Sequence, residues 1–448
     1  MFFWGGKKMS NKIWKKGLVL GIITLFIGVG VVQSTESIVF DYYSQPDTVY
    51  VDDDFNSSTP GWEYDHFDNI RNGIMAVANQ GTVIVYNGIY YESFDTHTKS
   101  IHLIGEDKES TIIDCSGLNN HAIRIHTSGF TIQGFTLTYA GGNPYLPSGI
   151  VLSPDLSSIS ISDCIFTNMD HGIYFENVSN LDIRKCHFHH NDDSSIFGIE
   201  PGIISEYNEN ITITDCIFNN NGKELGGGYY QTGGISMHSC SNTEIANCTI
   251  YDNIGMGIQI TNTLNVTINN NNIYGNSVVG IRLADDNINL EIYKNTIYNN
   301  TLFGVILEEG HFSNSNVHNN NISYNGNRLD KENDLIPTGG LWIDVVANGG
   351  LIIKQNKIAN NDIYGIILAY ECSSVKINQN NFFNNNESDA YFRYYDKFLP
   401  GNRWSNNYWS KPKFLPKLII GDVYITGLNI LVPWFNIDWR PALKPHDI

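Results

Sequence analysis

The chain has 448 residues, with 27 Lys and Arg against 46 Asp and Glu and a net charge of −19 at pH 7. Five of the lysines fall within the first 34 residues, which contain no acidic residue, so the remainder of the chain is more acidic still. Nucleic-acid-binding proteins normally present a basic surface, and this composition argues against nucleic acid as a partner.

The chain begins with a pattern typical of an export signal. The lysines are followed by an apolar run over residues 17–32 and then by Gln33 and Ser34. A helix over this run would be about 24 Å long, shorter than the roughly 30 Å hydrocarbon core of a bilayer. Residues 1–34 are therefore predicted to be a signal peptide, with a retained membrane anchor as the alternative. Either way the rest of the chain is expected outside the cell or at its surface, touching membrane only through this segment if it is uncleaved.

Residues 35–47 are predicted to form a linker, and residues 48–115 an N-terminal cap with the first strands. Asp65 is the expected N-cap of a helix that runs through Asn79, with Gly81 after its end. A solenoid must cover its first open coil, because exposed strand edges pair with other molecules. The helix is predicted to be this cover.

Residues 116–386 carry a repeat of 23–24 residues that is clearest in Thr243–Gly257, Val266–Gly280 and Leu290–Gly304. Short β-branched runs alternate with Asn and Gly corners, which predicts a parallel solenoid of about ten coils. Corner Asn tolerates a left-handed backbone, and its amide can bond the Asn of the next coil. The glycines expected to open one strand of each coil are Gly149, Gly172, Gly202, Gly234, Gly257, Gly280, Gly304, Gly340 and Gly365.

Three coils are longer than the others. In each, the extra residues are predicted to lie between the corner Asn and the following Gly. The predicted insertions cover residues 192–201, 222–233 and 326–339.

Four of the seven cysteines share one position of the repeat, three residues after an Ile: Cys164, Cys186, Cys216 and Cys248. Asn occupies the same position in later coils. We expect these cysteines to form an internal column in which each thiol packs as a small apolar group. Disulfides between adjacent coils and a metal-binding column are the alternatives.

Past Asn386 the repeat pattern stops, and residues 387–448 are predicted to form a C-terminal cap rich in Trp and Pro. The opening over residues 50–55 and 81–85, and the ending around Trp404, Trp409 and Trp434, resemble proteins of the pectate-lyase-like superfamily. The similarity is greatest to its NosD-like, carbohydrate-binding and sugar-hydrolase group, including exported archaeal members. This resemblance implies an all-β fold, a right-handed parallel β-helix. The superfamily contains lyases, hydrolases, epimerases and proteins without known catalysis.

Alternation along each Gly-led strand places the residues two and four after Gly on the outer face. Glu176 and Glu206 are expected on adjacent coils about 5 Å apart, near the about 5–5.5 Å of retaining glycosidases. A solvated acidic face is the alternative for any single carboxylate. The catalytic candidates are Glu176, Glu206, His238, Glu308 and Asp344, and the substrate-binding candidates are Tyr174, Gln259, Arg282 and Trp342.

Two clusters are candidates for metal binding. His187 and His189 alternate onto one face, and Asp192 can complete a ligand set, for which the NosD resemblance implies copper. The alternative is a polar corner. Clustered carboxylates at residues 52–54 are candidates for Ca²⁺, with a charged strand end as the alternative.

Three functions follow from these observations. The first is a surface protein that binds polysaccharide or a surface glycan and acts on it by hydrolase or lyase chemistry, or only binds it. The second is a non-catalytic adhesion element or structural rod. The third is a copper-accessory protein.

Overall fold

The computed structural model describes residues 44–139, 147–199, 208–225, 229–230, 233–326, 337–346, 350–398 and 401–448. The chain separates into two compact units, Met1–Gln45 and Pro46–Ile448. The predicted leader lies outside the described residues. Within those residues, no helix is long and apolar enough to cross a bilayer.

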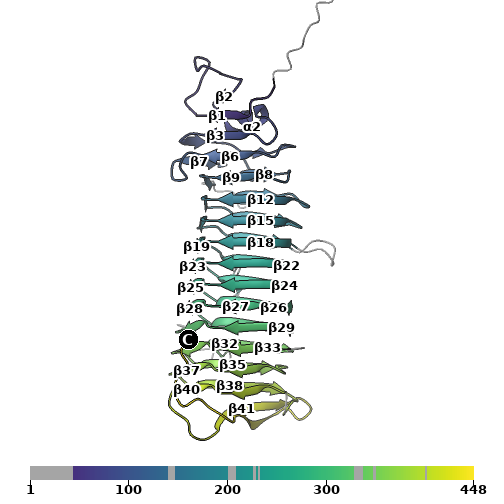
Figure 1. The fold of residues 1–448 in the computed structure, drawn as a ribbon, viewed down its shortest axis with the longest axis vertical. Coiled ribbons are helices and arrows are strands. Elements are labelled where there is room, and N and C mark those ends of the chain that lie inside the picture. The colour runs from purple at the N-terminus through teal and green to yellow at the C-terminus, as the bar shows by residue number, and fades with distance from the viewer. Residues whose placement is uncertain are drawn as a thin grey trace, which may run out of the picture. The chain divides into compact units, whose positions relative to one another are not determined.

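Pro46–Ile448 is a parallel β-helix in which successive coils stack along one axis (Figure 1). Each full coil contributes one strand to each of three parallel ladders, A, B and C, and this confirms the predicted all-β solenoid. Ladder A contains β1 (Thr48–Val51), β3 (Thr82–Val85), β6 (His102–Gly105), β9 (Thr131–Gln133), β12 (Ser157–Ser162), β15 (Ser179–Arg184), β18 (Asn208–Thr214), β27 (Glu291–Tyr293), β30 (Ser315–His318), β33 (Leu351–Lys354), β36 (Lys376–Asn378) and β39 (Arg403–Ser405).

Ladder B runs beside it and carries the outer face predicted to hold the site. It contains β5 (Phe94–Asp95), β8 (Ile123–Ile125), β11 (Ile150–Leu152), β14 (Ile173–Glu176), β17 (Ile196–Ile199), β22 (Ile235–Ala246), β24 (Ile258–Asn269), β26 (Val279–Ile288), β29 (Phe303–Ser313), β32 (Gly339–Val346), β35 (Tyr364–Tyr370), β38 (Ser388–Tyr395) and β41 (Lys417–Ile425). The long strands β22 and β24 run through both ladders.

Ladder C has thirteen strands among the described residues, so the solenoid has more coils than the ten that the repeat predicts. They are β4 (Gly88–Tyr90), β7 (Thr111–Asp114), β10 (Thr136–Thr138), β13 (Ile165–Thr167), β16 (His187–His189), β19 (Ile217–Asn219), β23 (Thr249–Tyr251), β25 (Asn272–Tyr274), β28 (Thr296–Tyr298), β31 (Asn321–Ser323), β34 (Lys357–Ala359), β37 (Asn381–Phe383) and β40 (Tyr408–Trp409). A short antiparallel pair, β20 (Glu224–Leu225) and β21 (Tyr229–Tyr230), projects from one coil.

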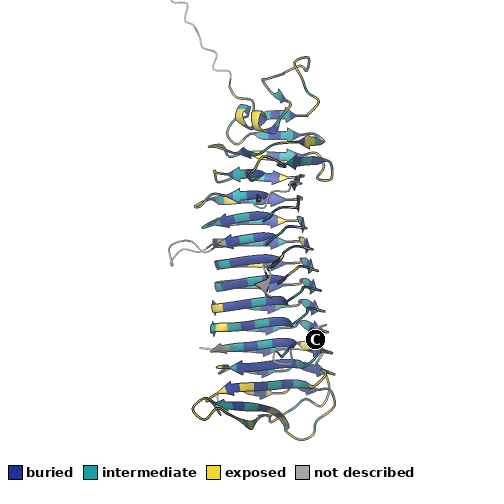
Figure 2. Ribbon diagram, turned by 180° about the vertical axis from the view of Figure 1, so that it is seen from behind, coloured by how far each residue is buried: buried dark blue, intermediate teal, exposed yellow. Residues whose placement is uncertain are grey.

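The core lies inside the coils, where alternate strand residues stack on their counterparts one coil away (Figure 2). Phe166, Phe188 and Phe218 illustrate this, with ring centroids 4.7 and 4.9 Å apart and nearly parallel planes. Period-two alternation thus buries one apolar face of each strand and leaves the other to solvent.

A short helix, α2 (Ile70–Ala76), covers the first coil, as predicted, but it is shorter than expected. Its N-cap is Asn69, whose side chain accepts from the backbone N–H of Asn72 at 2.9 Å. Asp65 is not the cap, because the next two residues form β2 (His66–Phe67), which pairs with β1. A Cβ on Gly73 would lie 2.7 Å from a methyl group of Val51, so this glycine lets the helix pack directly on β1.

One strand assignment was wrong. The strand that follows β14 in ladder B is β17, and it starts after Ser195 instead of after Gly202. The backbone N–H of Ser195 bonds the carbonyl of Gly234, so a small serine takes the position that the sequence pattern reserved for glycine. The extra residues of this coil therefore follow its ladder B strand, and residues 200–207 lie outside the described part of the chain.

The four repeat cysteines form the predicted internal column. All seven cysteines are free and buried. The Cys186 thiol donates to the carbonyl of Ile161 at 3.7 Å, and burial raises the pKa values of Cys164, Cys186 and Cys216. This confirms core packing over disulfides.

Asparagine continues this column, and a second column consists of buried asparagines throughout. In the second, each Oδ1 accepts both the backbone N–H and the Nδ2 of the Asn one coil earlier, as between Asn276 and Asn300 at 3.2 and 2.9 Å. The left-handed backbone falls on the residue before the column Asn, such as Asn299 with φ 54°, and not on the column Asn itself. The second column comprises Asn191, Asn221, Asn253, Asn276, Asn300, Asn325, Asn361 and Asn385.

The coil pattern continues beyond Asn386, where the sequence predicted its end. β38, β39 and β40 form another complete coil on β35, β36 and β37. The C-terminal cap is the antiparallel hairpin of β41 and β42 (Ile430–Asp438), which lies at the lower end in Figure 1. Asp438 is fully buried and accepts from Asn407 Nδ2 at 3.1 Å, so it ends the column that starts at Cys164.

We predict that Asn300→Ala lowers the free energy of unfolding by about 2–4 kcal/mol, because two buried donors of Asn276 lose their acceptor. Urea denaturation followed by circular dichroism measures the change. Asn272→Ala, at a half-buried position on the outer side of β25, is the matched control and should change the midpoint little. Equal effects of the two substitutions would contradict a special role for the column.

Candidate functional site

The outer face of ladder B brings four predicted site residues together near the C-terminal end of the stack. Residues that are direct cross-strand partners on successive strands form a row across the ladder. One row contains Arg282, Ile306 and Trp342, and the row two residues further along the strands contains the partners Glu308 and Asp344. Arg282, Glu308, Trp342 and Asp344, with the aromatic residues described next to them, are called the ladder B site below.

Arg282 and Glu308 form a tight ion pair across neighbouring strands. The guanidinium Nε lies 2.6 Å from Glu308 Oε1, and the side chains are 20% and 22% exposed. This pair fixes Glu308 as an oriented hydrogen-bond acceptor at the surface.

Asp344 has a different environment. Burial is the main cause that raises its pKa to about 6, and the nearby charges of Glu308, Glu371 and Glu309 add to the rise. The backbone N–H of Glu371 donates to Asp344 Oδ1 at 3.3 Å, which opposes the rise. Two carboxyl groups on neighbouring coils therefore have contrasting settings, an arrangement that separates acid and base roles in enzymes.

A bulge lies directly beside these carboxylates. The register between β29 and β32 shifts between Glu308 and Gly310, where Glu309 has a φ of 58°. A Cβ on Gly310 would lie 1.9 Å from the carbonyl oxygen of Asp285, so only glycine fits this crossing. Bulges re-aim side chains at functional positions.

Aromatic side chains continue the site along the same face. The Trp342 ring packs edge-on against Phe303 and Tyr370, with centroids 5.5 and 5.6 Å away. Tyr370 lies 4.8 Å from Tyr395 in turn. These aromatic rings, whose planes are inclined to one another, form a continuous platform on the outer strand face.

A polar group borders this platform. Tyr391 stacks on Tyr364 with centroids 4.8 Å apart, and its hydroxyl donates to Asp422 at 2.6 Å and accepts from Arg393 at 3.1 Å. Tyr370, Tyr391 and Arg393 were not predicted from the sequence. Tyr391 and Arg393 alternate outward on β38, but this strand lies beyond the boundary assigned at residue 386.

The other predicted residues lie further up the stack. Tyr174 packs 5.8 Å from the rings of His171 and Phe197, six ladder B strands from Trp342, or about 29 Å at about 4.8 Å per strand. His238 meets Thr261 through a 2.8 Å hydrogen bond, and Gln259 occupies the adjoining row. Tyr174 and His238 do not join the ladder B site. Gln259 borders it, because Gln259 is the direct neighbour of Arg282 on the adjacent strand.

The predicted pairing of Glu176 with Glu206 is wrong in register. The neighbour of Glu176 on the next coil is Ile199, because β17 follows β14. Glu206 lies outside the described residues.

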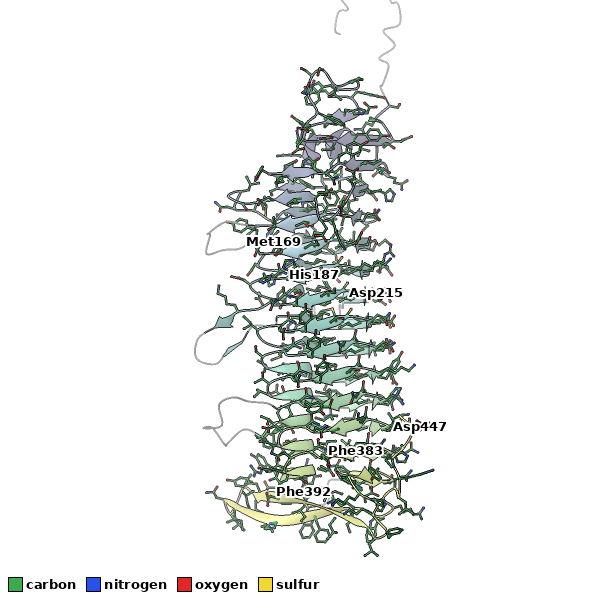
Figure 3. All side chains as sticks on the ribbon, turned by 90° about the vertical axis from the view of Figure 1, so that its left-hand side faces the viewer. Met169, His187, Asp215, Phe383, Phe392 and Asp447 are labelled. Atoms are coloured by element: carbon green, nitrogen blue, oxygen red, sulfur yellow. The ribbon has the colours of Figure 1, made fainter. Side chains whose placement is uncertain are left out.

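The histidine cluster is only partly assembled. His187 and His189 lie side by side on β16, with ring centroids 4.5 Å apart, on the part of ladder C where Figure 3 labels His187. Burial is the main cause that lowers the pKa of His189 to about 4. Asp192 forms an ion pair with Lys223 at 3.2 Å and does not complete a set with the two imidazoles.

The described residues contain one cluster of three acidic side chains with ligand atoms within 4.8 Å of one another, Asp52, Asp53 and Asp54. Asp52 accepts from the backbone of Asp54, and Asp53 from that of Ile89. Both contacts are those of a charged strand end, the alternative given above for Ca²⁺.

A separate hollow of about 620 Å³ lies at the corner between ladders A and C. It is lined by side chains of both signs, and Lys108 in it pairs with Asp163 at 2.7 Å. Three acidic and three basic residues line it, so its formal charges balance.

Comparison with known proteins agrees with the fold. A family model described as a right handed beta helix region matches residues 72–232 and 228–343. Tailspike protein 3 of bacteriophage CBA120 is 12% identical, with a TM-score of 0.52 over 88% of this chain and 69% of that one. The Dettilon tailspike protein is 14% identical, with a TM-score of 0.49 over 84% and 73% of the two chains. A search of curated proteins found no match.

We predict that Asp344→Asn raises the melting temperature at pH 8 by about 2 °C and leaves it unchanged at pH 4. The folded protein binds the Asp344 proton more tightly than the unfolded chain, so stability rises as pH falls through 6 toward 4. Asparagine removes the buried charge that is costly above pH 6 and keeps the acceptor for Glu371. Scanning calorimetry across this range is the measurement, and a difference independent of pH would contradict the assignment.

Proposed function

The chain belongs to the right-handed β-helix family, and from this premise we propose that it binds polysaccharide at the ladder B site. The observation that carries the proposal is the platform of Trp342, Tyr370 and Tyr395 beside the carboxylates of Glu308 and Asp344. Aromatic faces pack against the apolar C–H faces of sugars, while carboxylates and guanidinium groups bond sugar hydroxyls.

The two carboxyl groups also suit polysaccharide cleavage. Asp344, with a pKa near 6, holds a proton that it can donate to a leaving oxygen. Glu308, oriented by Arg282, is the partner that acts as base or nucleophile. Neighbouring strands lie about 4.8 Å apart, close to the about 5–5.5 Å between carboxyl groups of retaining glycosidases. We therefore propose hydrolase or lyase chemistry as the reaction of this site.

The proposal includes the location of the protein. The lysine-rich and apolar start of the chain supports export to the cell surface, and the acidic remainder suits a solvated exterior. Membership of the NosD-like group and likeness to exported archaeal members are part of the same proposal. Copper handling is not, because Asp192 is engaged with Lys223 and does not join His187 and His189.

The test is chromatography of the protein on a panel of neutral and acidic polysaccharides, measuring both retention and shortening of the polysaccharide. We predict that Trp342→Ala reduces retention by about tenfold or more, because each aromatic contact contributes about 1 kcal/mol beyond its buried area. A Glu308→Gln, Asp344→Asn variant should stop shortening while retention persists.

Tyr274→Ala is the matched control. Tyr274 also belongs to a row of aromatic rings on an outer strand face, where it stacks between Tyr251 and Tyr298 on ladder C. It should retain polysaccharide normally. Retention that survives Trp342→Ala but fails in the control would place the site on ladder C. No retention of any polysaccharide would favour the adhesion or structural rod.

A further inference from the structure

Exposed large hydrophobic side chains are concentrated in the C-terminal segment that contains the hairpin of β41 and β42. Of the 21 large hydrophobic side chains that are exposed among the described residues, 11 lie between residues 414 and 448. Phe414, Leu415, Ile420 and Trp439 are 85%, 76%, 70% and 69% exposed. An apolar surface of this kind marks an interaction site.

These side chains adjoin one another. Along β41, Ile419 and Val423 are buried against the last coil, and alternation turns Leu418 and Ile420 outward. Ile420 pairs with Phe435 across the hairpin, so exposed apolar residues of both strands share its outer side. The broad hairpin forms the lower end of the ribbon in Figure 3.

The segments on either side of the hairpin extend this surface. Lys417, the first residue of β41, pairs with Asp438, the last of β42. The chain before β41 and the chain after β42 therefore leave at the same end, which brings Phe414 and Trp439 to one edge. We call the surface formed by the outer side of the hairpin and this edge the cap face.

The cap face is also the basic part of an acidic protein. Residues 411–440, the hairpin with its flanks, contain four basic and two acidic residues, whereas the whole chain carries −19. The tail that follows leaves the cap face, because His446 bonds Asn381 of β37. Asp438 is buried under the hairpin, and Asp422 accepts from Tyr391. Among the described residues no ion pair involves any of these four basic side chains, which are Lys411, Lys413, Lys417 and Arg440. The Lys417 ammonium lies over the Trp409 ring, 5.8 Å from its centroid, which leaves Lys411, Lys413 and Arg440 for a ligand.

We propose that the cap face binds an anionic lipid surface. Exposed Phe, Leu and Trp side chains between lysines enter the headgroup region, and unpaired basic groups are attracted by anionic lipids. A second copy of this chain suits the face less well, because it would bring like charges together. The proposal is independent of the polysaccharide site, which lies on the side of the stack.

The experiment is co-sedimentation of residues 46–448, a compact unit with its own core and both ends covered, with lipid vesicles. Omitting the first 45 residues ensures that the apolar run over 17–32 cannot supply the binding. We expect binding to phosphatidylcholine vesicles that contain about 30% phosphatidylglycerol, weakened by salt, and far less to pure phosphatidylcholine.

Two cap variants separate the contributions. Lys411→Glu, Lys413→Glu, Arg440→Glu should weaken partitioning by roughly 100-fold or more, at about 1 kcal/mol for each positive charge lost. Phe414→Ser, Leu415→Ser, Trp439→Ser should weaken it at high and low salt alike. Lys294→Glu, Lys357→Glu, Lys376→Glu is the matched control on the coils and should bind as the unchanged protein does.

Failure to bind the anionic vesicles would overturn the proposal, and so would an equal loss in the control variant. A third result would do the same: self-association without lipid that the cap variants abolish, together with no vesicle binding. That outcome would make the cap face an interface between copies of the chain.

Discussion

Buried amide groups tie each coil to the next, and the rest of the structure depends on this tie. An asparagine side chain offers two N–H donors and an acceptor oxygen. Identical residues on the coils before and after it take the oxygen and one N–H, and a backbone carbonyl takes the second N–H, as that of Ile273 does for Asn300. Asn300 accepts from Asn276 and donates to Asn325 in this way. Displacing one coil would leave several buried polar groups without partners, each at a cost of about 1–3 kcal/mol. The columns therefore fix the register along the stack.

Such columns need special residues at their ends, because the last amide has no further coil to bond. Asp438 supplies the acceptor for Asn407 and also accepts from the indole Nε1 of Trp409. Asp389 accepts from Asn385 at the end of the second column. The inner side of the hairpin thus ends the column through Asp438. Its outer, apolar side takes no part in this and is available for binding.

The fixed register also explains how the candidate catalytic carboxylates come to lie together on ladder B. Strand alternation turns every second residue of ladder B outward, and the columns align these residues from coil to coil. Glu308 and Asp344 become neighbours although 36 residues separate them in the sequence. The adjacent bulge at Glu309 and Gly310 departs from the regular register at the carboxylates themselves.

The regular coils could be predicted from the sequence because Asn, Cys and Ile recur where the geometry demands them. The errors in the predicted strands arose at positions where a different residue type fits the same structural position. Ser195 replaces the expected glycine because the position needs only a small side chain. The strand was therefore predicted to start too late in the sequence, and Glu206 instead of Ile199 was taken as the neighbour of Glu176. The coil after Asn386 was missed because Trp404 fills the core row that Ile353 and Ile377 occupy in the two coils before it.

The ladder B site was only partly predictable. Arg282, Glu308, Trp342 and Asp344 followed from alternation after glycine. Sequence could not show that burial raises the pKa of Asp344, nor that Tyr391 and Arg393 extend the same face. Those features depend on neighbours about 20–50 residues away along the chain, at one or two coils' distance.

The most direct test of the account is amide hydrogen exchange, measured with and without an oligosaccharide that the protein retains. Binding at the ladder B site predicts added protection in β29, β32 and β35, with the strands of ladder C unchanged. Protection confined to ladder C, or to the coils around Tyr174, would contradict it.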